Sequence, residues 1–195
     1  MAVKSNFASG NVLTASDVNT YLTNGGLVYI TETSASGSAT TLSINNCFSA
    51  SYNNYRILID YFQPATAART VFMRLRSGGT DATGADYYFA LAGYFTTAAA
   101  VSDFNSAGTT SMTTGLYNSG NTLGLGAASI DLYAPFKTER TYGLVHSAGY
   151  DSNFFYRTGI IEHNLTNSYD GFTLLLSGTG NITNLRVKVY GYRQA

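Results

Sequence analysis

The sequence predicts an all-β protein, an antiparallel β-sandwich of jelly-roll-like type preceded by one short N-terminal helix. Three observations predict it: short segments alternate apolar and polar residues, clusters of Gly, Asn, Asp and Ser separate them, and no second helical pattern follows the first. Alternation with a period of two places one set of side chains in a core and the other on a surface. About ten such segments suit a sandwich or barrel better than a sheet with crossover helices.

The first 26 residues carry the signals of a single helix. A capping box begins it, a hydrophobic staple brackets the cap, and an Asn-Gly-Gly sequence ends it. Apolar residues spaced i, i+3 and i+4 form one narrow face, and a helix of about ten residues needs a partner surface for that face. These signals come from Leu13, Thr14, Asp17, Val18, Tyr21 and Leu22. We therefore expect an attachment segment at 1–26 and a β-sandwich domain at 27–195.

The segments after residue 26 follow one another as strands and turns. In 70–76, Val71, Met73 and Leu75 lie on one face of the expected strand, and 184–192 repeats this pattern. The region 96–128 is rich in small and hydroxyl residues and predicts either a long excursion or several short edge strands. The expected strands are 27–33, 41–45, 55–62, 70–76, 87–95, 129–135, 140–147, 154–164, 171–177 and 184–192.

The composition is poor in charge and rich in aromatic residues. Only 11% of the 195 residues are charged and the net charge is +0, so no basic field is available to attract nucleic acid or an anionic membrane. The chain has 16 Tyr and 11 Phe, with Ser, Thr, Asn and Gly as the main polar residues. Proteins near zero net charge are poorly protected against association, so this composition favours a subunit of an assembly.

One cysteine and the absence of long apolar segments limit the cellular setting. Cys47 has no intrachain partner, and we expect it to be a buried, unreactive thiol. The N-terminus lacks the apolar run of a signal peptide, and no segment reaches the roughly 18 apolar residues of a membrane span. We expect synthesis in a cytoplasm and no insertion into a membrane.

The histidines and carboxylates do not form a recognisable catalytic motif. His146 and His163 are expected at strand ends, and no G-x-S-x-G sequence fixes a nucleophile beside them. Asp131 and Glu139 flank an expected turn and are the pair that a glycan hydrolase would use, since its two carboxylates lie roughly 5–9.5 Å apart. Ordinary polar roles explain these residues equally well, and we expect a non-enzymatic protein with no catalytic residues.

No metal or cofactor is expected either. The sequence has no H-x-x-x-H or C-x-x-C spacing for zinc. Asp81 and Asp86 lie in a Gly-rich turn and offer oxygen ligands for a cation, but their spacing matches no standard calcium loop. A solvated turn is the simpler interpretation, and whether this turn binds a cation stays open at this point.

Outward-facing aromatic residues are the best candidates for a contact surface. Neighbouring residues of a strand point to opposite faces, so each aromatic pair supplies one core ring and one outward ring. Such rings stack on sugars or anchor protein interfaces, and arginines beside them add hydrogen-bond donors. The candidate contact residues are Tyr52, Arg74, Arg76, Tyr88, Tyr156 and Arg157.

Two stretches resemble virion proteins of tailed bacteriophages, including those of cyanophages. The N-terminal one is similar to the helix that precedes the first strand in many tail-fibre and minor tail proteins, and the C-terminal one is similar to the end of a β-sandwich domain of virion proteins. The matching positions of the first are Gly10, Leu13, Thr14, Ala15, Asp17, Val18 and Asn19. Those of the second are Ser177, Gly180, Ile182, Thr183, Tyr190 and Gly191.

The resemblance implies a virion structural protein that is usually a homotrimer. We expect a short tail fibre or appendage subunit that docks on the particle through 1–26 and presents its sandwich for attachment to host-surface glycans. A capsid decoration or head-fibre protein is the alternative, and a glycan-active hydrolase on the same scaffold is a more distant one. The expected partners are other virion proteins, further copies of the chain and host polysaccharide, and the expected location is the virion.

Overall fold

The computed structural model describes residues 26–65, 68–96, 98–118, 126–151 and 153–193, with only the backbone at 98–103 and 151. All regular secondary structure in these ranges is β-strand, and every pair of neighbouring strands is antiparallel. The all-β, antiparallel prediction is therefore confirmed. The predicted N-terminal helix, with the six residues from Leu13 to Leu22 that signal it, lies outside the described residues.

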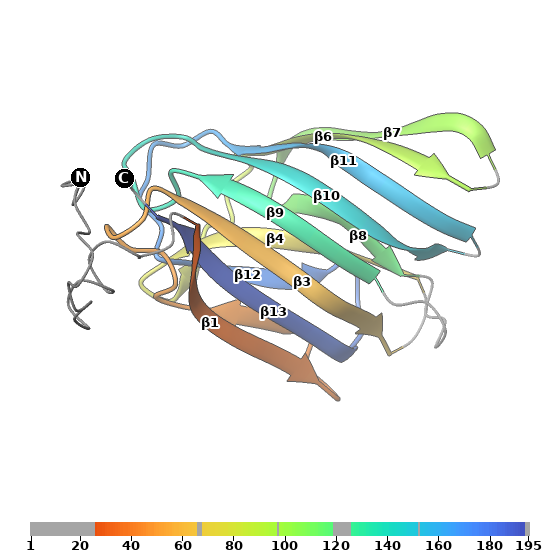
Figure 1. Cartoon of the computed structure of the whole chain (residues 1–195), viewed down its shortest axis with the longest axis horizontal. Helices are drawn as coiled ribbons and strands as arrows, with labels where there is room; N and C mark the ends of the chain where they lie inside the picture. The colour runs from red at the N-terminus through yellow and green to blue at the C-terminus, as the bar shows by residue number, and fades with distance from the viewer. Residues whose placement is uncertain (1–25, 66–67, 97, 119–125, 152, 194–195) are drawn as a thin grey trace, which may run out of the picture.

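The strands form two sheets that pack face to face (Figure 1). The larger sheet contains, in spatial order, β1 (Leu27–Ser36), β13 (Ile182–Tyr192), β3 (Asn54–Pro64), β9 (Gly126–Tyr133), β10 (Thr141–Asp151), β11 (Asn153–His163), β6 (Tyr87–Phe95) and β7 (Ala98–Thr109). The smaller contains β2 (Thr41–Ile44), β12 (Gly171–Leu176) and β4 (Arg69–Ser77), with β8 (Met112–Asn118) and β5 (Thr80–Asp81) both paired to β4.

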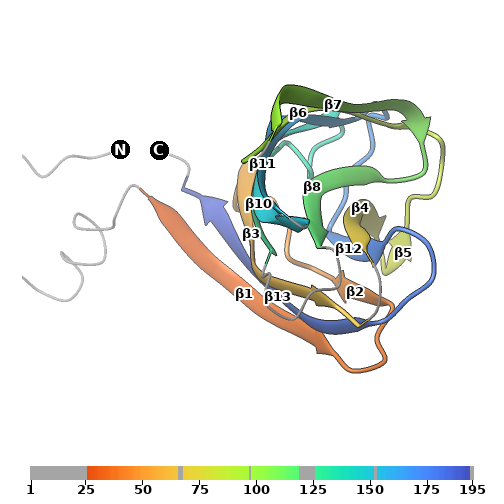
Figure 2. The ribbon, with the colours of Figure 1, turned by 90° about the vertical axis from the view of Figure 1, so that its right-hand side faces the viewer.

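The larger sheet is wider than the smaller one and curves around it. Figure 2 shows β6 and β7 bending over β8, while β1 and β13 form the opposite border. In spatial order, β1-β13-β3-β9 of the larger sheet and β2-β12-β4-β8 of the smaller one form an eight-strand unit, and β10, β11, β6 and β7 continue the larger sheet past β9. These four added strands therefore widen the outer face of the larger sheet.

Alternate residues of most of the long strands point inward and build one apolar core between the sheets. Val71, Met73 and Leu75 of β4 are fully buried, as the alternation in the sequence predicts, and β13 buries alternate residues in the same way. Burying such side chains contributes roughly 1.5–3 kcal/mol each, which makes this layer the main source of stability. The largest fully buried side chains are Tyr55, Tyr87, Phe48, Phe62, Phe172, Ile57, Ile59, Met73, Leu75, Met112, Leu116 and Ile130.

The region 96–128 contains strands rather than an excursion. β7 occupies the edge of the larger sheet, as one of the two alternatives predicts. β8 lies beside β4 at an edge of the smaller sheet, as the same alternative predicts, and is nearly all buried. Its small and hydroxyl residues suit this buried place, because Thr114 donates to the carbonyl of Val71 (2.8 Å) and Gly115 has a φ of 69° that favours glycine.

The single cysteine has the buried environment that the sequence predicts. Cys47 is a buried free thiol, and burial raises its pKa to about 12, so it stays protonated and unreactive. No helix in the described ranges is long and apolar enough to cross a membrane.

Tyr52, one of the candidate contact residues, has a packing role at one end of the sandwich. It lies between β2 and β3, half-buried, and its ring meets that of Tyr55 edge-on with centroids 5.9 Å apart. Gly191 of β13 leaves room for the ring, since a Cβ at this position would be 2.4 Å from Cγ of Tyr52.

We therefore predict that Gly191→Ala destabilises the fold by about 1–3 kcal/mol, because the added methyl group must displace the ring. Chemical denaturation with urea measures this change. Introducing Gly191→Ala into a Tyr52→Ala background is the control, and the penalty should shrink there because the obstructing ring is gone. An equal penalty in both backgrounds would contradict this explanation.

Candidate contact surface on the eight-stranded sheet

The outer face of the larger sheet exposes an unusual number of large apolar side chains. Most of them are on β6, β10 and β11, where they face away from the core because the inward positions of these strands are occupied by core residues. Phe154 is 66% exposed and Ile160 is 58% exposed. We call this surface the outer apolar patch, and it consists of Tyr94, Tyr142, Leu144, Phe154, Tyr156 and Ile160. Exposed apolar side chains that gather on one face of a soluble protein are candidates for an interaction site.

The strand register places the patch residues beside one another. Leu144 on β10 lies opposite Ile160 on β11, and Tyr156 on β11 lies opposite Tyr94 on β6. Directly opposite residues have Cβ atoms only about 4.5–5.5 Å apart, so the members of each pair are neighbours, and the row that contains His146 and Thr158 lies between the two pairs.

A shallow hollow of about 350 Å³ adjoins the patch. Its floor is low because small residues meet there: Ala127 of β9 lies opposite Ala148 of β10, and Ser129 lies opposite His146. Larger side chains surround the floor, with Leu58 and Asp60 on β3 and Tyr156 on β11. This volume is at the lower end of the roughly 300–1,000 Å³ that small-molecule sites occupy.

His146 fixes the orientation of Tyr156 at the rim of the hollow. Nδ1 of His146 lies 2.8 Å from the hydroxyl of Tyr156 and 3.1 Å from Oγ1 of Thr158. The two rings are nearly parallel, with an interplanar angle of 21° and centroids 6.3 Å apart. His146 lies in the middle of β10, so the prediction that it sits at a strand end is wrong. Because the ring of Tyr156 is already held in one orientation, it loses little conformational entropy when a ligand binds.

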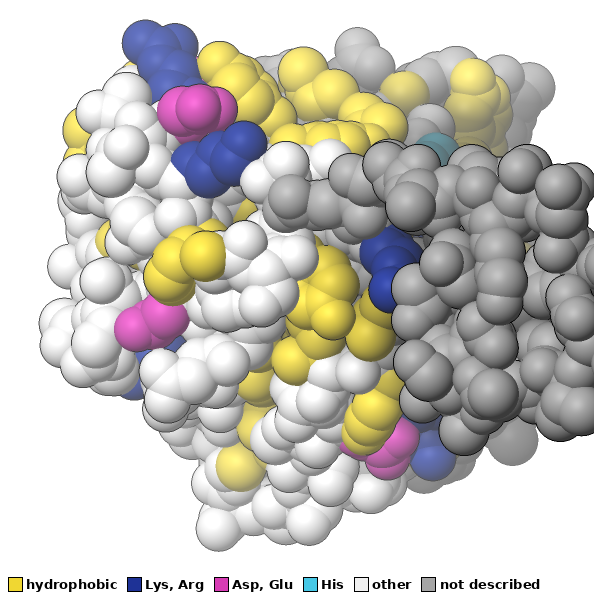
Figure 3. All heavy atoms as spheres, turned by 60° about the vertical axis from the view of Figure 1, so that its left-hand side comes forward, with side chains coloured by type: hydrophobic (Ala, Val, Ile, Leu, Met, Phe, Trp, Pro, Cys, Tyr) yellow, Lys and Arg dark blue, Asp and Glu magenta, His cyan; other side chains and the backbone are white. Residues whose placement is uncertain are grey.

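The carboxylates near the hollow are paired with arginine and lysine side chains. Asp60 accepts hydrogen bonds from Nε of Arg186 (2.8 Å) and Nζ of Lys188 (2.9 Å). Partial burial raises the pKa of Asp60, but these two donors outweigh burial, and the pKa lies below its ordinary value. Figure 3 shows this pairing of opposite charges on one face of the molecule. The few acidic side chains in this view lie beside basic ones, and most of the remaining described surface is uncharged.

Asp131 is held in a second ionic network on the same face. Nε and Nη2 of Arg56 donate to its two oxygens at 2.7 and 2.6 Å, and the hydroxyl of Tyr192 donates to Oδ1 at 2.6 Å. Burial acts to raise the pKa of Asp131, but the bonds from Arg56 and Tyr192 prevail and lower it. Burial and the bond to Asp131 raise the pKa of Tyr192 to about 12.

These charges bear on the hydrolase alternative. A general acid needs a raised pKa, whereas that of Asp131 is lowered and both its oxygens are occupied by Arg56. His163 is fully buried between Tyr87 and Tyr169, and burial lowers its pKa, so it stays neutral. Neither residue has the environment of a catalytic acid.

The candidate contact residues do not form a single surface. Tyr88 and Tyr156 share the outer face of the larger sheet, where Nδ2 of Asn164 donates to the Tyr88 hydroxyl at 3.3 Å. Arg74 and Arg76 lie on the outer face of the smaller sheet, and Tyr52 packs at one end of the sandwich.

Arg157 points into the sandwich. Its guanidinium lies 4.7 Å from the ring centroid of Phe155 and 5.4 and 5.8 Å from those of Phe104 and Tyr117. Nη1 donates to the carbonyl of Gly115 on β8 (3.2 Å), so Arg157 ties the two sheets together. The sequence contains the signal for this orientation: Tyr156 and Arg157 are neighbours in one strand and must face opposite sides.

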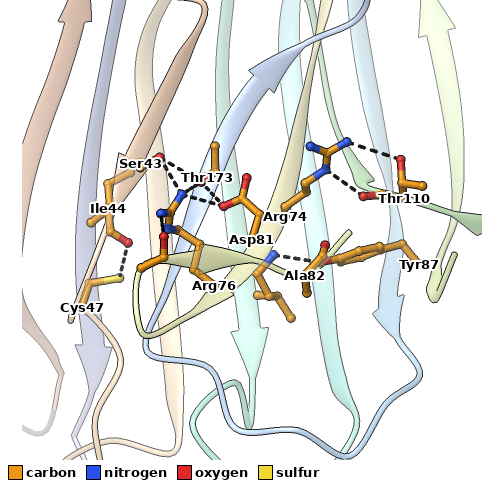
Figure 4. A network of polar contacts seen from close by, with 12 residues as sticks. Ser43, Ile44, Cys47, Arg74, Arg76, Asp81, Ala82, Tyr87, Thr110 and Thr173 are labelled. Carbon is orange, nitrogen blue, oxygen red and sulfur yellow. Dashed lines mark hydrogen bonds and ion pairs between the residues drawn. The ribbon is translucent and has the colours of Figure 1, made fainter. Parts of the chain in front are cut away.

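Arg76 is at the centre of a polar network that joins four strands of the smaller sheet (Figure 4). Its Nη1 donates to Oδ1 of Asp81 (2.6 Å), Oγ1 of Thr173 (2.5 Å) and Oγ of Ser43 (2.8 Å), and its Nη2 donates to the carbonyl of Gly79. Arg74 donates through Nε to a backbone carbonyl at residue 110 (2.9 Å). Both arginines therefore have structural partners on this face.

The same network bears on the cation alternative for the Gly-rich turn. Oδ1 of Asp81 already accepts from Arg76 and Thr173. Within the described ranges, no group of three or more His, Cys, Asp or Glu side chains is arranged to hold a metal ion.

The geometry of the outer apolar patch stands without support from known proteins. The chain matches no model of a protein family, no curated protein and no solved structure. The class of the protein therefore follows from the fold alone: an antiparallel β-sandwich, with large apolar side chains exposed on the outer face of one sheet.

We predict that Asp131→Asn destabilises the protein by about 1–2 kcal/mol at pH 7, because Arg56 loses its charged partner. The folded-state pKa of Asp131 is lowered, so its contribution is present above the unfolded-state value of 3.8 and is lost as the pH falls through the folded-state value. The difference between the two proteins should therefore shrink below about pH 4. Urea denaturation at pH 7 and pH 3 measures it, and a pH-independent difference would contradict the ionic explanation.

Proposed function

We propose that this protein is a non-enzymatic subunit of a bacteriophage particle that binds a host-surface glycan through the outer apolar patch and the adjoining hollow. Residues 1–26 dock it on the particle, and the sandwich faces outward. The observation that carries the proposal is the group of exposed rings beside a hollow whose rim tyrosine is fixed by His146.

The strand order supports this class of protein. The arrangement β1-β13-β3-β9 with β2-β12-β4-β8 has the order of an eight-stranded jelly roll, a fold that occurs in viral capsid and lectin domains. This is support by fold analogy alone, since one fold hosts many functions. The resemblance of the two terminal stretches to tailed-phage virion proteins is independent of it.

The position of the patch supports a binding role. Five of the six patch residues are on β10 and β11, the strands that extend the larger sheet past the eight-strand unit: Tyr142, Leu144, Phe154, Tyr156 and Ile160. Stability of the sandwich gives no reason for exposed apolar side chains there. Sugar rings have apolar faces that stack on aromatic side chains and hydroxyl groups that bond to polar ones, and the hollow offers Tyr156 together with Ser129 and His146.

A capsid decoration protein is the second candidate, and one observation favours it. Leu144 and Ile160 lie opposite each other in the patch, and paired aliphatic side chains suit the core of a protein interface better than a sugar site. Labelled antibody on intact particles separates the two candidates: signal at the tail supports the adhesin, and signal over the head supports decoration.

We predict that Tyr156→Ala lowers retention on host envelope polysaccharide about tenfold, because it removes the ring at the rim of the hollow. Affinity chromatography or biolayer interferometry on immobilised polysaccharide measures the loss. Tyr29→Ala is the matched control: Tyr29 is 56% exposed on the same sheet but lies on β1, away from the patch, and its removal should leave retention unchanged. Absence of retention by the unaltered protein, or equal effects of the two variants, would overturn the proposal.

A further inference from the structure

Strand β1 leaves one long edge of the larger sheet open. It is hydrogen-bonded to β13 on one side, and among the described residues no strand pairs with its other side. None of its ten residues is buried. Figure 2 shows its N-terminal half extending away from the smaller sheet. Long open edges are ready templates for pairing with another strand, so natural proteins usually protect them.

The usual forms of protection are absent from the second half of this strand. The sequence of β1, LVYITETSAS, contains no Pro, Lys or Arg. Its one charged residue, Glu32, lies opposite Lys188 on β13, with 3.8 Å between the two charged groups, so its charge is partly neutralised within the chain. A register shift between Tyr29 and Thr31 distorts the first half, but pairing with β13 is regular from Thr31 to Ser36.

The backbone groups of this regular half point alternately toward β13 and toward the open edge. The N–H of Gly37, just after the strand, donates to the carbonyl of Thr183 on the β13 side at 3.4 Å. Since the direction alternates along an antiparallel strand, the N–H and C=O groups of Glu32, Ser34 and Ser36 face the open edge. These groups form a regular row of donors and acceptors.

We infer that β1 pairs antiparallel with β1 of a second copy of this chain, so that two larger sheets join into one continuous sheet across a two-fold axis. A pair centred on Ser34 places Glu32 opposite Ser36 of the second copy. In this register the two Glu32 carboxylates do not lie directly opposite each other. Like charges in directly opposite positions would destabilise the pair of strands. The near-zero net charge of the chain leaves little long-range repulsion to oppose this contact.

A second copy fits this edge for a geometric reason. An isologous contact needs only one surface, because the same residues serve on both sides of the axis. Two edge strands of the smaller sheet are short: β2 has four residues and β5 has two. The half-buried inward residues Thr31, Thr33 and Ala35 would be covered further by a neighbouring strand. The inference gives an assembly of two copies, in place of the three that the resemblance to phage proteins implies.

The test is the mass of the full-length protein in solution, measured by light scattering coupled to size-exclusion chromatography at micromolar concentration. We expect two chains of 20.8 kDa. Ser34→Pro should raise the dissociation constant of the dimer at least about tenfold, since it removes a donor at the centre of the contact. Proline is tolerated where the N–H faces away from the sheet, so the monomer should keep its circular dichroism spectrum.

Two further variants keep the test decisive if Ser34→Pro fails to fold. Ser34→Lys places two like charges directly opposite each other at the two-fold axis and should also give monomers. Thr138→Lys adds charge to an exposed loop instead and should remain a dimer. A monomeric or trimeric unaltered protein would overturn the inference, as would a dimer that survives in the edge variants. A monomer whose β1 amides resist hydrogen exchange would place residues of the same chain on this edge and would equally overturn it.

Discussion

The alternation of side chains in paired antiparallel strands is the constraint on which the rest of this structure depends. In β3, β9, β10, β11 and β13, every second residue enters one apolar layer between the sheets, and a slip of one residue would exchange the two faces. Because the core fixes the inward half so strictly, the outward half is free to vary. The charged pairs, the small residues of the hollow and the exposed rings all belong to that outward half.

The strands that widen the larger sheet are where the outward residues carry the apolar patch. Strands β10, β11, β6 and β7 continue the sheet past the eight-strand unit, and their inward residues still need cover. β8 supplies it: Gly115 admits the close approach of Leu91 and Ser147, and Arg157 links β11 to β8 through the Gly115 carbonyl. The interior thus supports the strands whose outer face carries the apolar patch. Structural roles for Arg76 and Arg157 leave the patch and hollow as the better-supported contact surface.

Much of the fold could be predicted from the sequence, and less of the site. Clean alternation marks β4, β6 and β13, and the bounds 87–95 are those of β6. The burial of β8 was not predictable because its small and hydroxyl residues are buried through glycine conformation and hydrogen bonds to β4, which leave no hydrophobic period. Tyr156 is identifiable as an outward ring, whereas Arg157 faces inward by the same alternation. Leu144 and Ile160 are aliphatic residues within strands, so the sequence favours a place in the core, and only the strand register shows that they lie on the outer face of the sheet.

The most direct test of the central claim, that the outer face of β6, β10 and β11 is the contact surface, is a chemical-shift map. An isotope-labelled sample of this 20.8 kDa protein would be titrated with oligosaccharides released from the host envelope. The account predicts that perturbed amides cluster around Tyr94, His146, Tyr156 and Ile160. Perturbations around Arg74 and Arg76 on the smaller sheet, or none at saturating oligosaccharide, would contradict it.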